Sequence, residues 1–251
     1  MRRLIFNADD YGLSPGVSEG ILQAAKAVVR STTVMANLAT EVELAALRGG
    51  AIGVGAHLNV STGAPLTSDY PQALLDGQGR FLRDRALLPE TWDDAGNRRA
   101  ALAEWEAQVW RLEAAGMHLD HFDSHHHVHL LPQLFTTALG LARRFRLGLR
   151  TDRRALAAAR RAGVPAPDDL VAGFFGRENL TREQLLSLLA SASGDVVEVM
   201  CHPGRVDRLL AERSSYVAER QVELDLLGGS TLALSLESAG WVLASYAQAF
   251  G

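Results

Sequence analysis

Short apolar segments rich in β-branched residues alternate with helical segments along nearly the whole chain, and this alternation restricts the fold more than any other feature. Strands that alternate with helices pair in parallel through right-handed crossovers. We therefore predict an α/β fold with parallel strands, a TIM-like (β/α) barrel of regular or distorted form. Strands are predicted at residues 4–8, 32–36, 51–58, 119–122, 147–151, 196–201 and 241–246, and helices at 14–29, 41–48, 98–115, 132–145, 153–162, 216–227 and 230–238, with another beginning at Thr181.

The chain length of 251 residues suits one βα-barrel domain, because such barrels commonly occupy about 200–250 residues. No repeat or linker divides the chain, so we expect residues 1–251 to form a single domain. Residues 59–94 interrupt the alternation with Gly, Pro, Thr, Ser and Asp that follow no period. We predict a functional loop or lid there. Its Trp92 and Tyr70 are candidates for a surface that stacks on a sugar, with packing of the loop as the alternative.

Composition restricts the partners and the compartment. The net charge of −4 provides no basic field that would bind nucleic acid or an anionic membrane surface. No segment approaches the roughly 18 apolar residues of a membrane-spanning helix, and the N-terminal apolar stretch is too short for a signal peptide. The single cysteine, Cys201, cannot form an internal disulfide and is expected in the core. These features predict a cytoplasmic protein, and barrel enzymes of this size often form symmetric homodimers.

Aspartate and histidine residues gather where four predicted strands end. Six of the eight histidines lie at such positions. Each position alone has a structural explanation: an Asp pair can cap a turn, a strand histidine can belong to the core, a histidine run can lie on the surface, and His-Pro-Gly can be a turn. The carboxyl ends of parallel strands meet at one edge, however, so together these residues favour a functional site. They are Asp9, Asp10, His57, Asp123, His125, His126, His127, His129 and His202.

These residue types suit hydrolysis assisted by a metal ion. Imidazole and carboxylate groups bind first-row divalent metals, and three protein ligands leave positions open for water and substrate. A second carboxylate beside the ligand carboxylate can act as a general base, and a histidine can act as a general acid. The pattern therefore predicts one divalent ion in a hydrolytic site, and this ligand set suits Zn²⁺.

Four motifs resemble those of the YdjC-like carbohydrate deacetylases, a family that includes chitooligosaccharide deacetylases. They occur in the family's order, and residues 220–246 resemble the family more loosely. The resemblance implies a βα-barrel enzyme that removes acetyl groups from N-acetylated sugars with the help of a divalent metal. The motifs are Asn7-Ala8-Asp9-Asp10-Tyr11-Gly12-Leu13-Ser14, Gly55-Ala56-His57-Leu58, His121-Phe122-Asp123-Ser124-His125-His126-His127-Val128-His129 and Cys201-His202-Pro203-Gly204.

The resemblance also implies roles for individual residues. Asp10, His57 and His125 resemble the metal ligands. His125 is the first histidine of the triple, so the two that follow it are not assigned to the metal. Asp9 resembles the general base of polysaccharide deacetylases, and His202 resembles the general acid.

Two further residues are candidates on their positions alone. Arg150 lies at the end of the predicted strand 147–151 and could pair with Asp9 and keep it ionised, with an ordinary exposed arginine as the alternative. Asp123 could accept a hydrogen bond from a ligand histidine, with turn capping as the alternative.

Two rival functions stay open at this point. A metal-dependent phosphoesterase would also use aspartates and histidines, although it usually requires more ligands and basic groups for phosphate. A non-catalytic sugar-binding protein would keep the metal but would need neither Asp9 nor His202. The sequence does not define the acetylated sugar, its length or its linkage.

Overall fold

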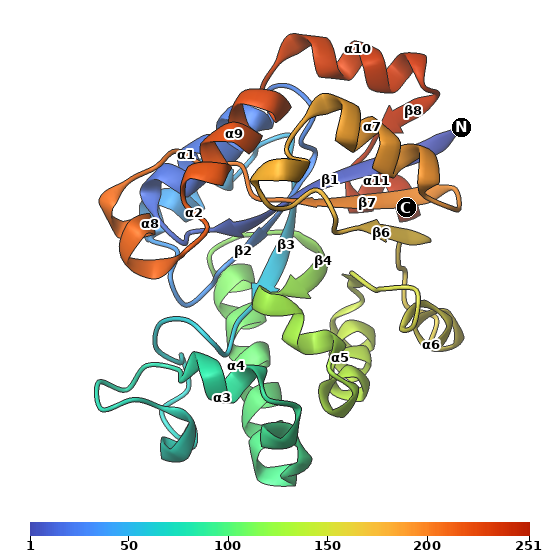
Figure 1. The fold of residues 1–251 in the computed structure, drawn as a ribbon. Helices are drawn as coiled ribbons and strands as arrows, with labels where there is room; N and C mark the ends of the chain where they lie inside the picture. Colours follow the sequence, from blue (N-terminus) through green and yellow to red (C-terminus); the bar gives the residue numbers. More distant parts are fainter.

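The computed structural model describes residues 1–251 and contains an entirely parallel eight-stranded sheet with helices around it (Figure 1). The strand order is β5-β4-β3-β2-β1-β7-β6, and β8 pairs with the first residues of β1. The strands are β1 (Arg2–Tyr11), β2 (Ser31–Val34), β3 (Gly53–Leu58), β4 (Leu119–Ser124), β5 (Gly148–Leu149), β6 (Asp169–Val171), β7 (Val196–Cys201) and β8 (Trp241–Leu243).

The sheet is curled into a half-barrel rather than a closed barrel. The two outer strands, β5 and β6, do not pair with each other, and a single hydrogen bond from the Leu149 N–H to the Pro165 carbonyl (2.8 Å) joins β5 to the segment before β6. The predicted α/β fold is therefore confirmed in its distorted, TIM-like form.

Helices cover the sheet and begin at the predicted signals where these are strong. Ser14 caps the first helix by accepting a hydrogen bond from the Val17 N–H, with Pro15 in the first turn. None of the helices has both the length and the apolar character needed to cross a membrane. The α-helices are α1 (Pro15–Ala24), α2 (Glu41–Leu47), α3 (Arg83–Leu87), α4 (Ala95–Ala114), α5 (Pro132–Phe145), α6 (Leu156–Arg161), α7 (Arg182–Ser191), α8 (Arg208–Arg213), α9 (Ala218–Leu227), α10 (Ser230–Ser238) and α11 (Tyr246–Phe250), and the 3₁₀ helices are Gln72–Leu74, Pro89–Asp93, His125–Leu130 and Arg177–Asn179.

The structure corrects several predicted boundaries. The first helix ends at Ala24 rather than near residue 29. The predicted strand 241–246 ends at Leu243, because Ser245 and Gln248 form a capping box that begins α11. Strand β6 and helix α8 were not predicted. Both are too short, at three and six residues, for their hydrophobic period to be recognised.

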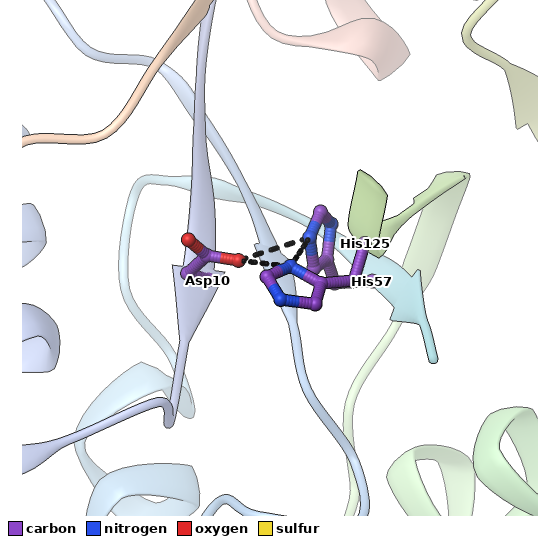
Figure 2. Close-up of side chains that lie close together, drawn as sticks. All are labelled: Asp10, His57 and His125. Carbon is purple, nitrogen blue, oxygen red and sulfur yellow. Dashed lines mark hydrogen bonds and ion pairs between the residues drawn. The ribbon is translucent and has the colours of Figure 1, made fainter. Parts of the chain in front are cut away.

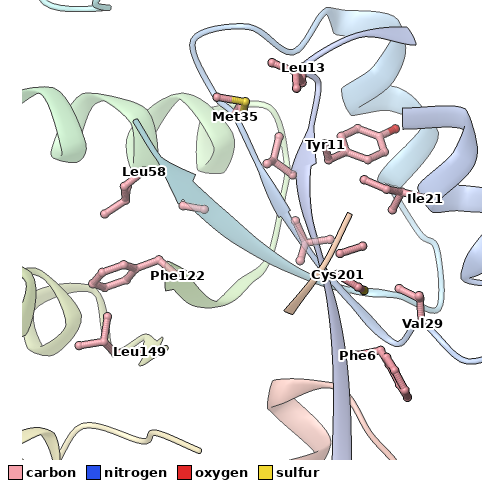
Figure 3. Close-up of a cluster of buried hydrophobic side chains, with 14 of the residues drawn as sticks. Phe6, Tyr11, Leu13, Ile21, Val29, Met35, Leu58, Phe122, Leu149 and Cys201 are labelled. Carbon is pink, nitrogen blue, oxygen red and sulfur yellow. The ribbon is translucent and has the colours of Figure 1, made fainter. Parts of the chain in front are cut away.

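Successive strand residues divide between two different environments. In β1, Phe6 and Ala8 belong to a cluster of 55 buried hydrophobic residues under the helices, part of which is drawn in Figure 3. Asn7 and Asp9 are equally buried but bond to polar side chains of other strands. The same division recurs in β4, where Phe122 packs in the apolar cluster and its neighbours His121 and Asp123 form polar contacts. Because strand side chains alternate between faces, the concave face of the half-barrel is polar.

Residues 59–94 are packed more tightly than a mobile loop would be. Trp92 is completely buried and its Nε1 donates to the Ala86 carbonyl (2.9 Å). Tyr70 is 3% exposed and stacks edge-on against Phe81. The prediction of a sugar-stacking surface on Trp92 or Tyr70 is therefore wrong, because both rings fill the core of the segment. Cys201 is buried as predicted.

Trp92 provides a test of this packing. Trp92→Ala leaves a large cavity and should lower the free energy of unfolding by about 3–5 kcal/mol, measured by urea denaturation. Trp110→Ala is the matched control, because Trp110 is 49% exposed on α4 and should change the stability much less. Equal losses for the two variants would show that residues 59–94 are not part of the cooperative core.

Candidate active site

A β-bulge in β1 allows two adjacent aspartates to face the same cavity. Side chains of consecutive strand residues normally point to opposite faces. The pairing of β1 with β2 shifts register between Ala8 and Tyr11, and Asp10 adopts a left-handed backbone conformation with φ of 70°. Aspartate tolerates this region better than most residues, and such strained positions concentrate at functional sites. As a result both Asp9 and Asp10 line the same cavity.

Asp10, His57 and His125 converge from β1, β3 and the turn after β4 (Figure 2). Asp10 Oδ1 lies 3.0 Å from His57 Nε2 and 2.9 Å from His125 Nδ1, and the two ring nitrogens are 3.3 Å apart. Ligand atoms about 2.0–2.2 Å from one first-row metal ion lie about 3 Å from each other, so these separations fit a shared ion.

The charge at this cluster also fits a cation. Asp10 Oδ1 is buried and has no well-directed hydrogen bond, although two ring nitrogens surround it. Burial would lower the pKa of His57, but the negative charges of Asp123 and Asp10 outweigh burial and raise it to about 10. Burial would likewise raise the pKa of Asp10, yet His125 and Arg220 hold it well below its usual value. The cluster therefore offers an ionised carboxylate, and its negative charges favour a positive charge at the ring nitrogens.

Asp123 fixes the orientation of the His57 ring. Its Oδ1 lies 2.6 Å from His57 Nδ1, and Thr33 Oγ1 donates to its Oδ2 (3.2 Å). With a metal ion beside Asp10, a carboxylate at Nδ1 would keep the proton on that nitrogen and leave the Nε2 lone pair for the ion. Asp123 is thus placed to orient a ligand histidine rather than to cap a turn.

Arg150 is completely buried and contacts three carboxylates. Its Nη1 and Nη2 donate to the two oxygens of Asp9 (2.6 and 2.7 Å), Nη1 lies 2.7 Å from Asp123 Oδ2, and Nε donates to Glu198 Oε1 (2.7 Å). Asp9, His57 and Asp123 form a second group that could hold a metal on distance alone. The guanidinium already bridges the two carboxylates of that group, whereas no arginine contacts Oδ1 of Asp10 in the first group.

His202 lies on the other side of Asp9 from Arg150. Its Nε2 is 3.9 Å from Asp9 Oδ2. Its backbone N–H donates to Glu223 Oε2, while the Tyr216 hydroxyl donates to Glu223 Oε1 (2.7 Å). Burial lowers the pKa of the His202 ring to about 4 and raises the pKa of Glu223 to about 7.

The last two histidines of the triple take different positions from His125. His126 and His127 both have left-handed backbone conformations, with φ of 57° and 54°, and they turn the chain sharply after β4. His126 Nδ1 lies 2.9 Å from Ser61 Oγ, and the His127 ring lines the cavity. Neither residue belongs to the group that surrounds Asp10 Oδ1.

Sequence reasoning missed Arg220, although it touches a ligand candidate. Arg220 is 2% exposed, and its Nη2 donates to Asp10 Oδ2 (2.6 Å), so that Oδ1 is the oxygen next to the two histidine rings. It lies on α9, more than 200 residues after its partner, with no local motif around it. Only the loose family resemblance of residues 220–246 pointed to this region. Tyr216 and Glu223 were missed for the same reason.

Many of these groups line one cavity of about 400 Å³ at the carboxyl ends of the strands, with Arg150 and Asp123 buried behind its wall. Its lining includes the three metal-ligand candidates, Asp9 and His202. Arg83 and Thr62, from the predicted lid segment, also contribute to the wall.

Comparisons with known proteins show the family and the fold. The family model described as YdjC-like protein matches residues 3–238. A carbohydrate deacetylase from Geobacillus stearothermophilus is 38% identical, with 98% of this chain and 97% of the relative covered. A chitooligosaccharide deacetylase from Yersinia enterocolitica is 37% identical, with 97% of each covered. A crystal structure of a protein from Enterococcus faecalis superposes with a TM-score of 0.85 at 29% identity, over 98% of both chains. This chain belongs to the YdjC-like protein family.

Proposed function

We propose that this protein is a metal-dependent hydrolase that removes N-acetyl groups from sugars or oligosaccharides and releases acetate. One observation carries the proposal: a metal-ligand triad, a buried carboxylate and a histidine share a single cavity at the carboxyl ends of the strands. The names of the relatives from Geobacillus and Yersinia, carbohydrate deacetylase and chitooligosaccharide deacetylase, support the substrate class.

Asp10, His57 and His125 would bind the ion. Asp123 would hold the ring of His57 in place, and Arg220 would hold the carboxylate of Asp10. A divalent metal bound there would polarise the acetamide carbonyl and acidify a water molecule. Two imidazoles and one carboxylate suit Zn²⁺, and Mg²⁺ is the other candidate.

Asp9 and His202 would move the proton that the reaction requires. Asp9 accepts a proton from the attacking water, and Arg150 holds both of its oxygens in place. His202 is neutral near pH 7 before the reaction, because burial lowers its pKa to about 4. His202 Nε2 lies 3.9 Å from Asp9 Oδ2, a gap that one bridging water could span, so the proton taken up by Asp9 would reach His202 and pass from it to the leaving nitrogen as the C–N bond breaks. Acetate and the free amino sugar leave.

The two rival functions have less support in the site. A phosphoesterase with two metal ions would need the second carboxylate group, which Arg150 bridges. A sugar-binding protein without catalysis would not need Asp9 and His202 side by side in the cavity. A cytoplasmic location, a homodimer, a single domain and a lid at residues 59–94 stay predictions that purified protein can test.

Removal of a metal ligand should abolish binding and turnover together. Asp10→Ala and His125→Ala should each lose the bound ion and lower acetate release from N-acetylglucosamine oligomers by at least about 100-fold, since even indirect supports of a ligand are worth 10- to 100-fold. Metal content is measured on the purified protein by mass spectrometry. His118→Ala is the control, because His118 is exposed and lies outside the cavity. Normal turnover in a metal-free variant would refute the ligand assignment.

Replacement of the base should separate metal binding from turnover. Asp9→Asn removes the proton acceptor but none of the three ligands, so the variant should retain its metal and lose about 10²- to 10⁴-fold in kcat. Thermal unfolding and metal content establish that the variant is folded and loaded. Full activity in Asp9→Asn would show that another group acts as the base.

The role of His202 depends on the leaving group. His202→Ala should lower acetate release from N-acetyl sugars by about 10²- to 10⁴-fold, because the departing amine must be protonated. 4-Nitrophenyl acetate has a leaving group that needs no proton, so its hydrolysis should fall far less. Equal losses on both substrates would contradict the general-acid role.

A further inference from the structure

Phe175 is an exposed aromatic residue on the wall of the cavity. It follows β6, in a stretch where the sequence shows no period, and its side chain is 44% exposed. Most other large exposed hydrophobic residues lie away from the cavity, including Trp110 on α4, which packs against Phe145. An exposed phenyl ring is therefore placed within reach of a substrate.

The phenyl ring is supported from behind. It stacks on Tyr216 with ring centroids 4.3 Å apart and planes 10° from parallel. Tyr216 is in turn held at both ends, since its hydroxyl donates to Glu223 Oε1 (2.7 Å) and its carbonyl accepts from Arg220 Nε (3.0 Å). These anchors come from α9, the helix that also supplies the arginine on Asp10. The aromatic pair is consequently a fixed wall.

The wall stands directly beside the catalytic groups. The His202 ring lies edge-on to both aromatic rings, with centroids 5.6 Å from each. Tyr216 covers one face of Phe175, and Phe175 lines the same cavity as Asp9 and Asp10. A group bound against Phe175 would therefore place its neighbouring substituent at His202.

We propose that Phe175, supported by Tyr216, is the platform on which a pyranose ring of the substrate stacks. This inference rests on the proposed deacetylase function and adds the residue that selects cyclic sugars over other N-acetylated amines. A pyranose in its chair form presents a flat patch of C–H groups, which carry a partial positive charge and pack on the negative face of an aromatic ring. With the ring on Phe175, the acetamido group reaches Asp9 and His202.

The experiment compares three variants with the metal-loaded wild-type protein. Phe175→Leu keeps an apolar side chain but removes the aromatic face, Phe175→Tyr keeps the face, and Trp110→Leu removes an exposed aromatic ring outside the cavity. Kinetics use the β-1,4-linked disaccharide of N-acetylglucosamine. Saturation-transfer NMR uses cellobiose, which has similar pyranose rings but no acetyl group to hydrolyse.

Phe175→Leu should raise KM for the disaccharide about 5- to 10-fold, with kcat changed less than about twofold, as expected for an aromatic contact of this kind. Saturation transfer to the cellobiose ring protons should weaken in the same variant. Phe175→Tyr and Trp110→Leu should match the wild type in both measurements.

Unchanged KM and unchanged saturation transfer in Phe175→Leu would overturn the platform, as would the absence of any transfer to ring protons in the wild type. These failures are distinct from failure of the proposed function. Cellobiose binding that depends on Phe175, with no acetate released from any N-acetyl sugar, would support the platform and refute the deacetylase. Acetate release with a wild-type KM in Phe175→Leu would support the deacetylase and refute the platform.

Discussion

The buried guanidinium of Arg150 provides the positive charge that the acidic side chains on the concave face of the half-barrel require. Three buried carboxylates, those of Asp9, Asp123 and Glu198, each contact this one cation. Unpaired buried charges cost several kcal/mol. Removal of Arg150 would therefore force the three carboxylates to take up protons or to move apart. Other parallel barrels fill the same space with layers of apolar side chains. Here most of the apolar packing lies under the helices, and only a small cluster that includes Ile5 and Tyr246 lies apart from it, so polar side chains occupy much of the interior.

Arg150 contacts residues that support both parts of the proposed reaction, the metal-ligand cluster and the proton-transfer pair. On one side it holds both oxygens of Asp9, next to His202. On the other side it contacts Asp123, which in turn fixes the ring of His57. The metal-ligand cluster and the proton-transfer pair are thus supported by the same charge. A fixed geometry of this kind lowers the reorganisation that a reaction requires.

The sequence predicted the elements that depend on local patterns and missed those that depend on distant contacts. The alternation of strands and helices was sufficient for the α/β fold, and the motifs at the strand ends named the residues that meet at Asp10. Local patterns could not reveal that a bulge turns Asp9 and Asp10 toward one cavity, because its cause is the left-handed conformation of a single residue. Arg220 and Phe175 reach the site only through the tertiary fold. The burial of Trp92 likewise depends on packing that its polar sequence neighbourhood does not reveal.

Because the sheet does not close, its outer strands have edges that could pair with a strand of another protein molecule. Where strands stop pairing, free N–H and C=O groups can recruit a strand from another chain and start aggregation. In this protein the two unpaired borders, β5 and β6, are only two and three residues long, and the Leu149–Pro165 hydrogen bond already uses part of one border. Borders this short offer too few groups for a foreign strand to attach. The half-barrel can therefore stay open to a bulky ligand without exposing a long strand edge that promotes aggregation.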